Sequence, residues 1–304
     1  MLIKQLKTLI PLSIKKAILT LFQEISRYVS EIPKLHDDFR KIHSSEVSSI
    51  VKRKIRRTLL WTFYFKKYNK KEMVANVVGN EVGFNYFNTL KGLFTEIFID
   101  QCYWFTTDTE SPIIIDCGSN YGQSVIYFKM LYPEAKITCF EPDDQTFSVL
   151  KHNIESNGIQ GVEMHKKAIA SHDGVIDFYN IDDNQGSLVM STIKERVPSG
   201  KKNSVEATRL SNYIDGPINF LKMDIEGSEM SVLKELKKSG KLQYVRQMVI
   251  EYHHHIVEHE DIGSTILTLI EDAGFGYQIK ADFLYPRKQI HFQDILIYAY
   301  NKNI

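Results

Sequence analysis

Asp116, Glu141 and Asp224 each stand at the end of a short apolar run in this 304-residue sequence. Carboxylates accept hydrogen bonds from sugar hydroxyls and attract cations, so their placement limits what they can bind. A β-branched run such as 113–115 suits a strand buried on both faces of a parallel sheet. The carboxyl ends of such strands share one edge of the sheet, where open α/β sheets bind ligands. We therefore expect the three carboxylates to line one site.

A glycine-bearing turn follows the first of these strands. Residues 117–124 are Cys-Gly-Ser-Asn-Tyr-Gly-Gln-Ser, which puts Gly118 and Gly122 where the backbone must turn sharply or approach a ligand. An amphipathic helix follows, and its N-terminus offers unpaired N–H groups. Glu141, at the end of the next strand, is placed to accept hydrogen bonds from both hydroxyls of a ribose. The stretch 113–142 therefore predicts a nucleoside-binding site.

The spacing of this turn separates two nucleoside cofactors. A dinucleotide-binding turn needs Gly-x-Gly-x-x-Gly, whereas this chain has Asp116-x-Gly118-x-Asn120-x-Gly122, with no third glycine at the required step. The acid beside the turn repels a pyrophosphate but favours a cation, and S-adenosylmethionine (SAM) carries both a sulfonium and an ammonium. The spacing favours SAM over NAD, and an NAD-dependent oxidoreductase on the same fold is kept as the alternative.

Two more clusters of polar residues follow later strands. Asp224 ends a central apolar strand, where an unpaired buried carboxylate would be costly, so it needs a partner or a ligand. Glu226 and Glu229 follow within five residues, and either can simply complement the N-terminal end of the next helix. Strand alternation puts Glu251 and His253 on one face of another strand. The neighbouring His254 and His255 are expected on the surface.

These segments together resemble the FkbM-type methyltransferases, a family within the class I SAM-dependent superfamily, from about Glu96 to about Phe275. The resemblance is carried by Glu96-Ile-Phe, Ile115-Asp-Cys-Gly-Ser-Asn-Tyr-Gly, Phe140-Glu-Pro, Leu221-Lys-Met-Asp-Ile-Glu-Gly-Ser-Glu229 and Glu251-Tyr-His253. The family's typical activity is O-methylation of a hydroxyl on a sugar or natural product. The resemblance thus implies a methyltransferase whose acceptor is a sugar, a glycan or a related metabolite.

The same resemblance implies which residues contact the cofactor. The turn 116–122 would line the methionine part of SAM, and Glu141 would hold the ribose. In related class I enzymes the turn after the following strand touches the adenine, which makes Ala168 and Ile169 candidates by analogy. The predicted cofactor-binding residues are Asp116, Gly118, Asn120, Gly122, Ser124, Glu141, Pro142, Ala168 and Asp224.

Methyl transfer from a sulfonium is mainly a problem of alignment, but the acceptor hydroxyl must also lose its proton. We expect His253, whose ordinary pKa is around 6.5, to act as the general base, with Glu251 orienting it. Asp224 completes the predicted catalytic group. In the alternative mechanism Asp224, Glu226 and Glu251, with or without His253, hold Mg or Mn, which lowers the pKa of the acceptor hydroxyl. We rank metal-free base catalysis first.

Alternating strands and helices predict an α/β fold with a doubly wound, mostly parallel sheet. The resemblance extends this to seven strands, closed by a reversed hairpin of 275–281 and 291–300. The connection between these two strands is too short for a helical crossover, which independently favours antiparallel pairing. Other expected segments are a strand over 162–170, edge strands at 176–179 and 204–208, and a polar loop at 180–203 as a candidate acceptor-binding lid.

Residues 1–71 differ from the rest of the chain in charge. They hold 17 of the 38 Lys and Arg but only 5 of the 37 Asp and Glu, which gives +12 there and −11 elsewhere. Apolar residues over 3–29 recur at three- and four-residue steps, which predicts an amphipathic helix that is bent or begins near Pro11. We divide the chain into a basic helical extension, 1–75, and a SAM-binding domain, 76–304.

The extension has two candidate uses. It can pack on the acidic catalytic domain or on a second subunit of a homo-oligomer, which is the commoner role of an amphipathic face. It can also attach the protein peripherally to an anionic membrane, since basic amphipathic helices gain from both lipid charge and apolar insertion. We expect no nucleic acid partner, because 1–71 contains no recognisable nucleic-acid module.

Composition bears on the compartment and on the broad class. Three cysteines without a disulfide or zinc spacing indicate reduced core residues. No run of 18 apolar residues occurs, and lysines such as Lys4 and Lys7 interrupt any secretory stretch. We expect a cytoplasmic protein, free or peripheral at the inner face of the membrane. A non-catalytic module that recruits lipid or partners is the alternative class, disfavoured by the costly acids at three strand ends.

Overall fold

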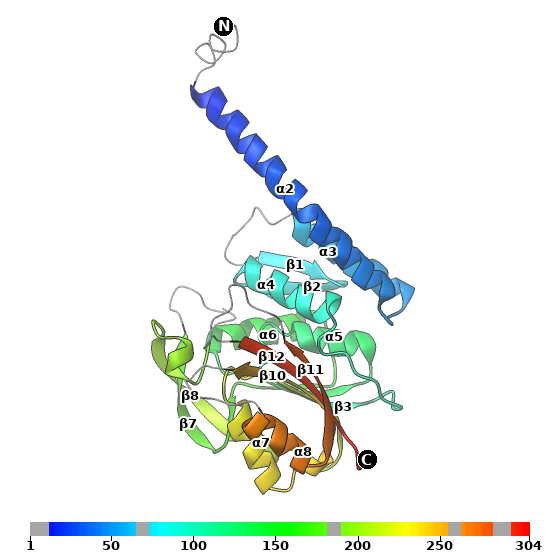
Figure 1. Ribbon diagram of the computed structural model, residues 1–304, viewed down its shortest axis with the longest axis vertical. Helices are drawn as coiled ribbons and strands as arrows, with labels where there is room; N and C mark the ends of the chain where they lie inside the picture. The colour runs from blue at the N-terminus through cyan, green and yellow to red at the C-terminus, as the bar shows by residue number, and fades with distance from the viewer. Residues whose placement is uncertain (1–11, 65–72, 181–189, 255–262, 282–292) are drawn as a thin grey trace. The chain divides into compact units, whose positions relative to one another are not determined.

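A computed structural model describes residues 12–64, 73–180, 190–254, 263–281 and 293–304 of the chain (Figure 1). The chain divides into two compact units, Met1–Lys52 and Arg53–Ile304. The predicted division into 1–75 and 76–304 stays a prediction, since compactness alone puts the break after Lys52.

The first unit contains one long helix, α2 (Leu12–Ser44), of 33 residues. It confirms the predicted N-terminal helix from Leu12 onward and extends it to Ser44, while 1–11 lie outside the described residues. Lys41 and His43 occupy its last turn, where cations complement the partial negative charge of a helix C-terminus. Within the described residues no helix is both long and apolar enough to cross a bilayer.

A mixed sheet forms the centre of the second unit. Its strands, as far as the structure describes them, lie in the order β11 (Phe275–Ala281), β12 (Gln293–Asn301), β10 (Val245–His254), β9 (Ile218–Met223), β3 (Ile113–Cys117), β4 (Lys136–Phe140) and β5 (Val162–His165). Strand β12 runs antiparallel to both β10 and β11, and the other pairs are parallel. This confirms the predicted doubly wound, seven-stranded sheet and its reversed hairpin.

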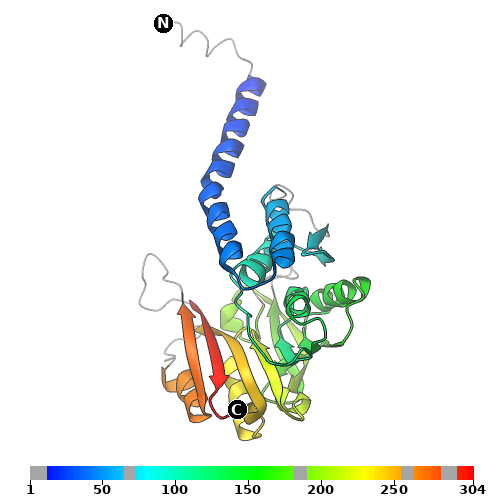
Figure 2. The same cartoon turned by 90° about the vertical axis from the view of Figure 1, so that its right-hand side faces the viewer.

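Helices cover both faces of this sheet (Figures 1 and 2). One face carries α5 (Gln123–Leu131) and α6 (Asp144–Ser156), and the other carries α7 (Glu229–Lys238) and α8 (Thr268–Asp272). Leu233 and Ile270 of the second pair pack in one core cluster with sheet residues such as Ile115. On the first face Phe128 of α5 meets Phe220 of β9 edge to face, with ring centroids 5.7 Å apart. Burial of both sheet faces explains the continuous apolar runs of the central strands.

Two predicted segments were wrong in detail. The strand expected over 162–170 is two strands, since β5 ends at His165 and β6 (Ala168–Ala170) belongs to another sheet. The polar pair Lys166 and Lys167 interrupts the apolar run at that point. The expected edge strands are β7 (Gly174–Asn180) and β8 (Lys201–Arg209), which join β6 in a separate three-stranded sheet in the order β6-β8-β7.

A hairpin that the sequence analysis missed connects the start of the second unit to its sheet. Strands β1 (Met73–Val77) and β2 (Asn80–Phe84) pair antiparallel around the turn residues Val78 and Gly79, which both have positive φ. Helix α3 (Ser49–Tyr64) reaches this turn, because the Val78 amide donates to Thr58 Oγ1 at 3.0 Å. The hairpin is followed by α4 (Phe87–Phe94) and a π-helical turn, η2 (Thr95–Ile99).

Asn153 of α6 and Asn157, which caps the C-terminus of that helix, hold β2 in place. Asn153, which is fully buried, accepts from the Gly83 amide at 2.7 Å and donates to the carbonyls of Gly83 and Tyr121. One turn further on, the partly exposed Asn157 accepts from the Glu81 amide and donates to its carbonyl. The two side chains therefore make comparable contacts at different depths.

This pair generates a prediction about stability. Asn153→Ala should lower the free energy of unfolding by roughly 2–4 kcal/mol, because it leaves buried backbone groups unpaired. Asn157→Ala should cost clearly less, because water can replace its contacts. Urea denaturation of both variants measures the difference, and equal losses would contradict this account of the hairpin.

Candidate active site

The turns after β3 and β9 touch one another. A Cβ atom on Gly118, whose φ is +90°, would lie 1.8 Å from the carbonyl oxygen of Asp224. The Asp224 amide donates to the Cys117 carbonyl at 3.1 Å. Only glycine fits such an approach, so the predicted cofactor turn and the predicted catalytic acid are fixed together by backbone contact.

The rest of the predicted turn also depends on unusual backbone angles. Asn120 and Gly122 have φ of 45° and 82°. A Cβ on Gly122 would lie 2.7 Å from Leu150 Cδ1 of α6, so the turn packs closely on α6, while the positive φ is what favours glycine there. Gly122 therefore brings the turn against α6.

Asp116 lies beneath the turn. Its side chain is 0% exposed, accepts a hydrogen bond from Ser124 Oγ at 2.5 Å, and lies 3.4 Å from Lys222 Nζ. Neither Asp116, Gly122 nor Ser124 lines the cavity described below. The predicted contact of these three residues with the cofactor therefore stays a prediction, and their observed contacts support the turn.

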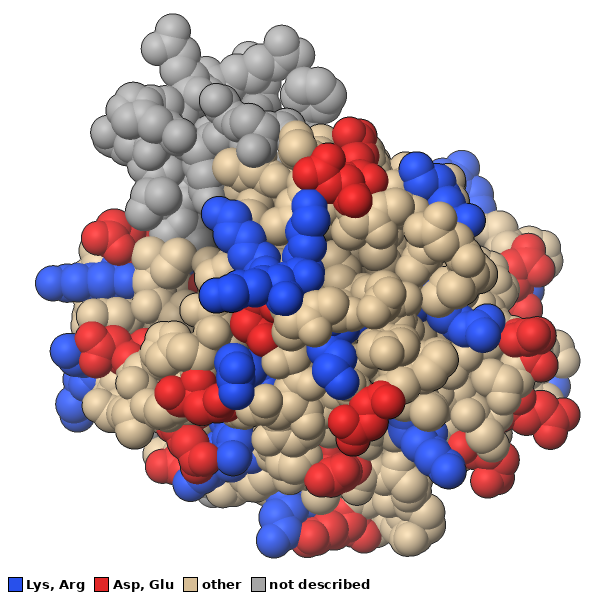
Figure 3. All heavy atoms as spheres, turned by 90° about the horizontal axis from the view of Figure 1, so that it is seen from below, with Lys and Arg blue, Asp and Glu red and all other residues tan. Residues whose placement is uncertain are grey.

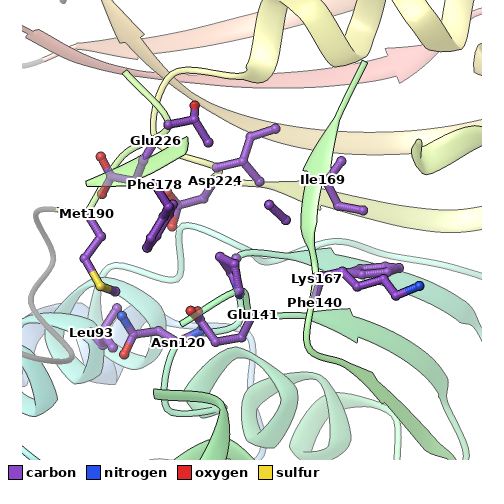
Figure 4. Close-up of a pocket in the computed structure, with 15 residues that line it drawn as sticks. Leu93, Asn120, Phe140, Glu141, Lys167, Ile169, Phe178, Met190, Asp224 and Glu226 are labelled. Atoms are coloured by element: carbon purple, nitrogen blue, oxygen red, sulfur yellow. The ribbon is translucent and has the colours of Figure 1, made fainter. Parts of the chain in front are cut away.

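A cavity opens at the carboxyl edge of the sheet, between the turns after β3, β4 and β9 (Figure 4). Gly118, Asn120, Glu141, Pro142, Ala168 and Asp224 of the predicted cofactor set line it. Figure 4 shows Asn120 and Glu141 on one side of the cavity and Asp224 and Glu226 across from them. The remaining lining residues are Leu93, Phe140, Lys167, Ile169, Phe178, Met190, Thr192 and Ile225. Leu93 and Phe178 come from segments with no motif, whereas Met190 belongs to the loop 180–203 that the sequence analysis named as a candidate acceptor-binding lid.

Glu141 is held in a fixed orientation in this cavity. Its two carboxyl oxygens accept from the amides of Asn120 at 3.1 Å and of Asp143 at 3.0 Å. Burial raises the pKa of Glu141 to about 8, against the lowering effect of these backbone donors. A buried carboxyl that already has two fixed donors presents its remaining lone pairs in a defined direction, as ribose recognition requires.

His253 lies beside the cavity, enclosed by acidic side chains. It is 3% exposed; its Nδ1 is 2.9 Å from Glu229 Oε1, and its Nε2 is 3.3 Å from Glu226 Oε2. Glu229 also accepts from the amide of Gly227. The carboxylate that orients His253 is therefore Glu229, whereas the sequence analysis expected Glu251. The sequence analysis missed this role because it explained Glu229 by the N-terminal end of the next helix.

Burial and the nearby carboxylates set the pKa values of His253 and Glu226. Burial lowers the pKa of His253, but the carboxylates of Glu229, Glu226 and Asp224 outweigh it and hold that pKa well above its usual value. Burial raises the pKa of Glu226 to about 8. The His253–Glu226 pair therefore retains a proton near neutral pH, and His253 by itself is not a free base in this arrangement.

Other acids complete the cluster. Glu251 shares a face of β10 with His253, and burial, together with the nearby Asp224 and Glu96, raises its pKa well above the usual range. Antiparallel pairing of β10 with β12 puts Asp294 opposite His253. Burial raises the pKa of Glu96, in η2, to about 7. Of these, the sequence analysis had named only Glu251 for the site.

On the opposite face of β10, the burial of His254 differs from the prediction. His254 is 7% exposed, and its ring lies 5.8 Å from that of Tyr252. The prediction that His254 lies on the surface was wrong, because β10 is an interior strand that is covered on both faces. His255 lies outside the described residues.

Two groups of side chains in this cluster have the geometry to hold a metal ion. They are Asp224 with Glu226 and His253, and Glu251 with His253 and Asp294, each with its ligand atoms within 4.8 Å of one another. Mostly oxygen ligands with one imidazole suit Mg or Mn. The predicted ligands Asp224, Glu226 and Glu251 are divided between these two groups, and metal binding stays a prediction.

Lys222 joins the two halves of the site and was not predicted. It is 2% exposed, donates to the Gly118 carbonyl at 2.7 Å, and lies 3.3 Å from Asp224 Oδ2. Pairing of β3 with β9 puts Lys222 directly beside Asp116. A signal existed in the sequence, because strand alternation puts Lys222 on the same face as Asp224.

Comparisons with known proteins show the family of this chain. A family model described as "Methyltransferase FkbM domain" matches residues 116–277, more than half of the chain, so the protein belongs to the FkbM methyltransferase family. "Methyltransferase sdnD" of Sordaria araneosa is 30% identical over 214 residues, which cover 60% of this chain and 81% of the relative. "Methyltransferase 1" of Beauveria bassiana is 29% identical over 205 residues, covering 61% and 80%.

Two further proteins are more distant. "2-O-methyltransferase NoeI" of Sinorhizobium fredii is 25% identical over 158 residues, 46% of this chain and 63% of the relative. The crystal structure of methyltransferase FkbM from Methylobacillus flagellatus KT has a TM-score of 0.44 and 17% identity, over 90% of this chain and 60% of that chain.

Lys222 generates a prediction for this site. Lys222→Met should lower the free energy of unfolding by about 3–5 kcal/mol, because it leaves Asp116 as an uncompensated buried charge. Lys234→Met, on the exposed face of α7, is the matched control and should change it by less than about 0.5 kcal/mol. Chemical denaturation measures both, and similar values for the two variants would refute the anchoring role.

Proposed function

We propose that the protein is a SAM-dependent O-methyltransferase that acts on a hydroxyl of a sugar, a glycan or a related metabolite. The observation that carries the proposal is that Asn120 and Glu141 face Asp224 and Glu226 across one cavity. One side suits a ribose, and the acids on the other side support a role in removing a proton from the acceptor. Membership of the FkbM methyltransferase family supports the reaction type.

The residues of the cavity fit the parts of SAM. The carboxyl of Glu141 would accept from the ribose hydroxyls, and the apolar wall that includes Phe140, Ala168 and Ile169 would take the adenine. Gly118 leaves room for close backbone approach by the methionine part. When bound, SAM supplies an electrophilic methyl group. The protein contributes alignment, which is worth on the order of 7–11 kcal/mol when complete.

We assign removal of the acceptor proton to the His253–Glu226 pair. Glu226 lines the cavity, and its carboxylate touches His253 Nε2, while Glu229 fixes the other ring nitrogen. Arg196 donates to the same carboxylate at 3.3 Å and limits its rotation. Because the pKa of Glu226 is about 8, a fraction of its carboxyl groups is ionised near neutral pH and can accept the proton, which then passes to solvent.

Metal-assisted activation is the alternative mechanism for the same reaction. Asp224, Glu226 and His253 would bind Mg or Mn, which would lower the pKa of the acceptor hydroxyl. The base mechanism and the metal mechanism use the same acids on the same side of the cavity, so the position of these acids does not distinguish the two mechanisms. The existing ion pairs of Glu226 with His253 and Arg196 favour the metal-free version, because those cations already balance its charge.

The acceptor class rests on weaker support. The printed name of the Sinorhizobium fredii relative gives it a 2-O-methyltransferase activity, which favours a hydroxyl acceptor here too.

We further propose that the protein works in the cytoplasm, where its cysteines, Cys102, Cys117 and Cys139, would stay reduced. We also propose that the first unit, Met1–Lys52, can pack against a second subunit in a homo-oligomer.

Calorimetric titration with SAM, S-adenosylhomocysteine and NAD tests the cofactor. SAM and S-adenosylhomocysteine should bind, and Glu141→Ala should weaken both roughly 10-fold to 100-fold, because it removes hydrogen bonds to the two ribose hydroxyls that are each worth about 0.5–1.5 kcal/mol. Glu134→Ala, an exposed carboxylate near the start of β4, is the control and should have no effect. Binding of NAD alone would move the oxidoreductase alternative to the front, and no binding to folded protein would favour a non-catalytic module.

Two perturbations separate the mechanisms. If the base is the His253–Glu226 pair, activity should survive EDTA, while His253→Ala and Glu226→Gln should each lower kcat roughly 100-fold to 10,000-fold with little change in SAM affinity. The exposed His172→Ala is the matched control. Loss of activity in EDTA, restored by Mg or Mn, would replace the base mechanism with the metal one.

A further inference from the structure

Helix α3 has two chemically different faces within the second unit. Ile55, Leu59 and Thr62 are buried, at 0%, 4% and 1% exposure. Arg53, Arg57 and Leu60, spaced by four and three residues, share the opposite face and are exposed. The apolar stripe of this helix is thus already used inside the unit, and a basic stripe is left on the surface.

Among the residues that the structure describes, the charge on that stripe has no acidic partner. Helix α3 contains five Lys and Arg and no Asp or Glu. Across the described ranges, Arg53, Lys54 and Arg57 form no ion pair with an acidic side chain. Five other surface cations of the second unit do pair, namely Lys166 with Asp144, Lys167 with Glu206, Lys202 with Asp177, Arg209 with Asp173 and Lys237 with Asp272. Lys234 and Lys238 of α7 are exposed and form no ion pair within the described part of the chain, which makes them suitable controls. The sequence after the helix, 65–71, adds four lysines and no acid.

An apolar residue ends the basic stripe. Leu60 is 39% exposed and lies seven residues beyond Arg53, so it is on the same face two turns further along. Trp61, next to it, is half-buried with its ring 6.0 Å from that of Phe87. A basic stripe with an exposed leucine and a neighbouring tryptophan matches the boundary between lipid headgroups and acyl chains.

We propose that the basic face of α3, consisting of Arg53, Arg57 and Leu60, docks on an anionic lipid bilayer. Each Lys or Arg held near such a surface strengthens binding roughly fivefold. A nucleic acid would use the cations but not the exposed leucine. A second copy of the chain would need an acidic patch, and Figure 3 shows one face of the molecule on which acidic and basic side chains are interspersed. The bilayer uses both the charge and the apolar end.

Co-sedimentation of the full chain with vesicles tests this surface. Vesicles of phosphatidylcholine with phosphatidylglycerol should bind the protein, and vesicles of phosphatidylcholine alone should bind it at least about tenfold more weakly. High salt should release the protein, because it screens exposed charges. Equal binding to both kinds of vesicle, or none to either, would overturn the proposal.

Variants assign the binding to α3. Arg53→Glu combined with Arg57→Glu should lower the vesicle affinity by at least about tenfold, and Leu60→Ser should lower it while leaving the charge unchanged. The matched control is Lys234→Glu with Lys238→Glu, a pair of exposed cations on α7 that should leave binding unchanged. Circular dichroism verifies that each variant is folded.

The remaining outcomes all count against the proposal. It fails if the α7 pair matters as much as the α3 pair, or if the α3 pair abolishes binding to duplex DNA or self-association while vesicle binding persists. The result is independent of the proposed methyl transfer, because none of the altered residues lines the cavity or belongs to the His253 cluster. Failure of one proposal therefore leaves the other standing.

Discussion

One ammonium group, Lys222 Nζ, lies buried between Asp116 and Asp224 and also binds the Gly118 carbonyl. Taking these charges out of water is costly, and only good pairing geometry offsets the cost. The adjacent strands β3 and β9 must therefore keep their register, and the two turns that follow them must stay in contact. The absence of a side chain at Gly118 permits that contact.

The rest of the site builds outward from this anchored pair of turns. The first turn presents its Asn120 amide to Glu141, which fixes the acid at the end of β4. The second turn continues through Glu226, at a φ of 54°, and Gly227, at 108°. Such a conformation is unfavourable for glutamate and persists only where the surroundings hold it, here Arg196 and His253. The strain aims the Glu226 carboxylate into the cavity.

The two ends of the second unit differ in their electrostatics. Around His253 the acids are half-buried, close together and partly neutralised by proton sharing, which suits chemistry in a secluded place. On α3 the exposed Arg53 and Arg57 form no ion pair within the described residues, which suits long-range attraction to an anionic surface. Family membership fixes the reaction class, whereas the residues that shape the cavity walls, such as Leu93, Phe178 and Met190, would decide which acceptor enters.

The sequence by itself determined the α/β class, the order of the central elements and the carboxylates at three strand ends, because alternation, β-branched runs and glycine turns are local properties. Only the tertiary structure decided that Asp116 supports the turn from beneath, that Glu229 orients His253, and that Asp294 joins the cluster. These facts depend on register between distant strands and on which groups share one buried volume. The split of the expected strand into β5 and β6 has the same origin, since β6 leaves the main sheet to pair with β8, more than 30 residues away in the sequence. Long-range packing sets such pairings, and a local pattern does not encode it.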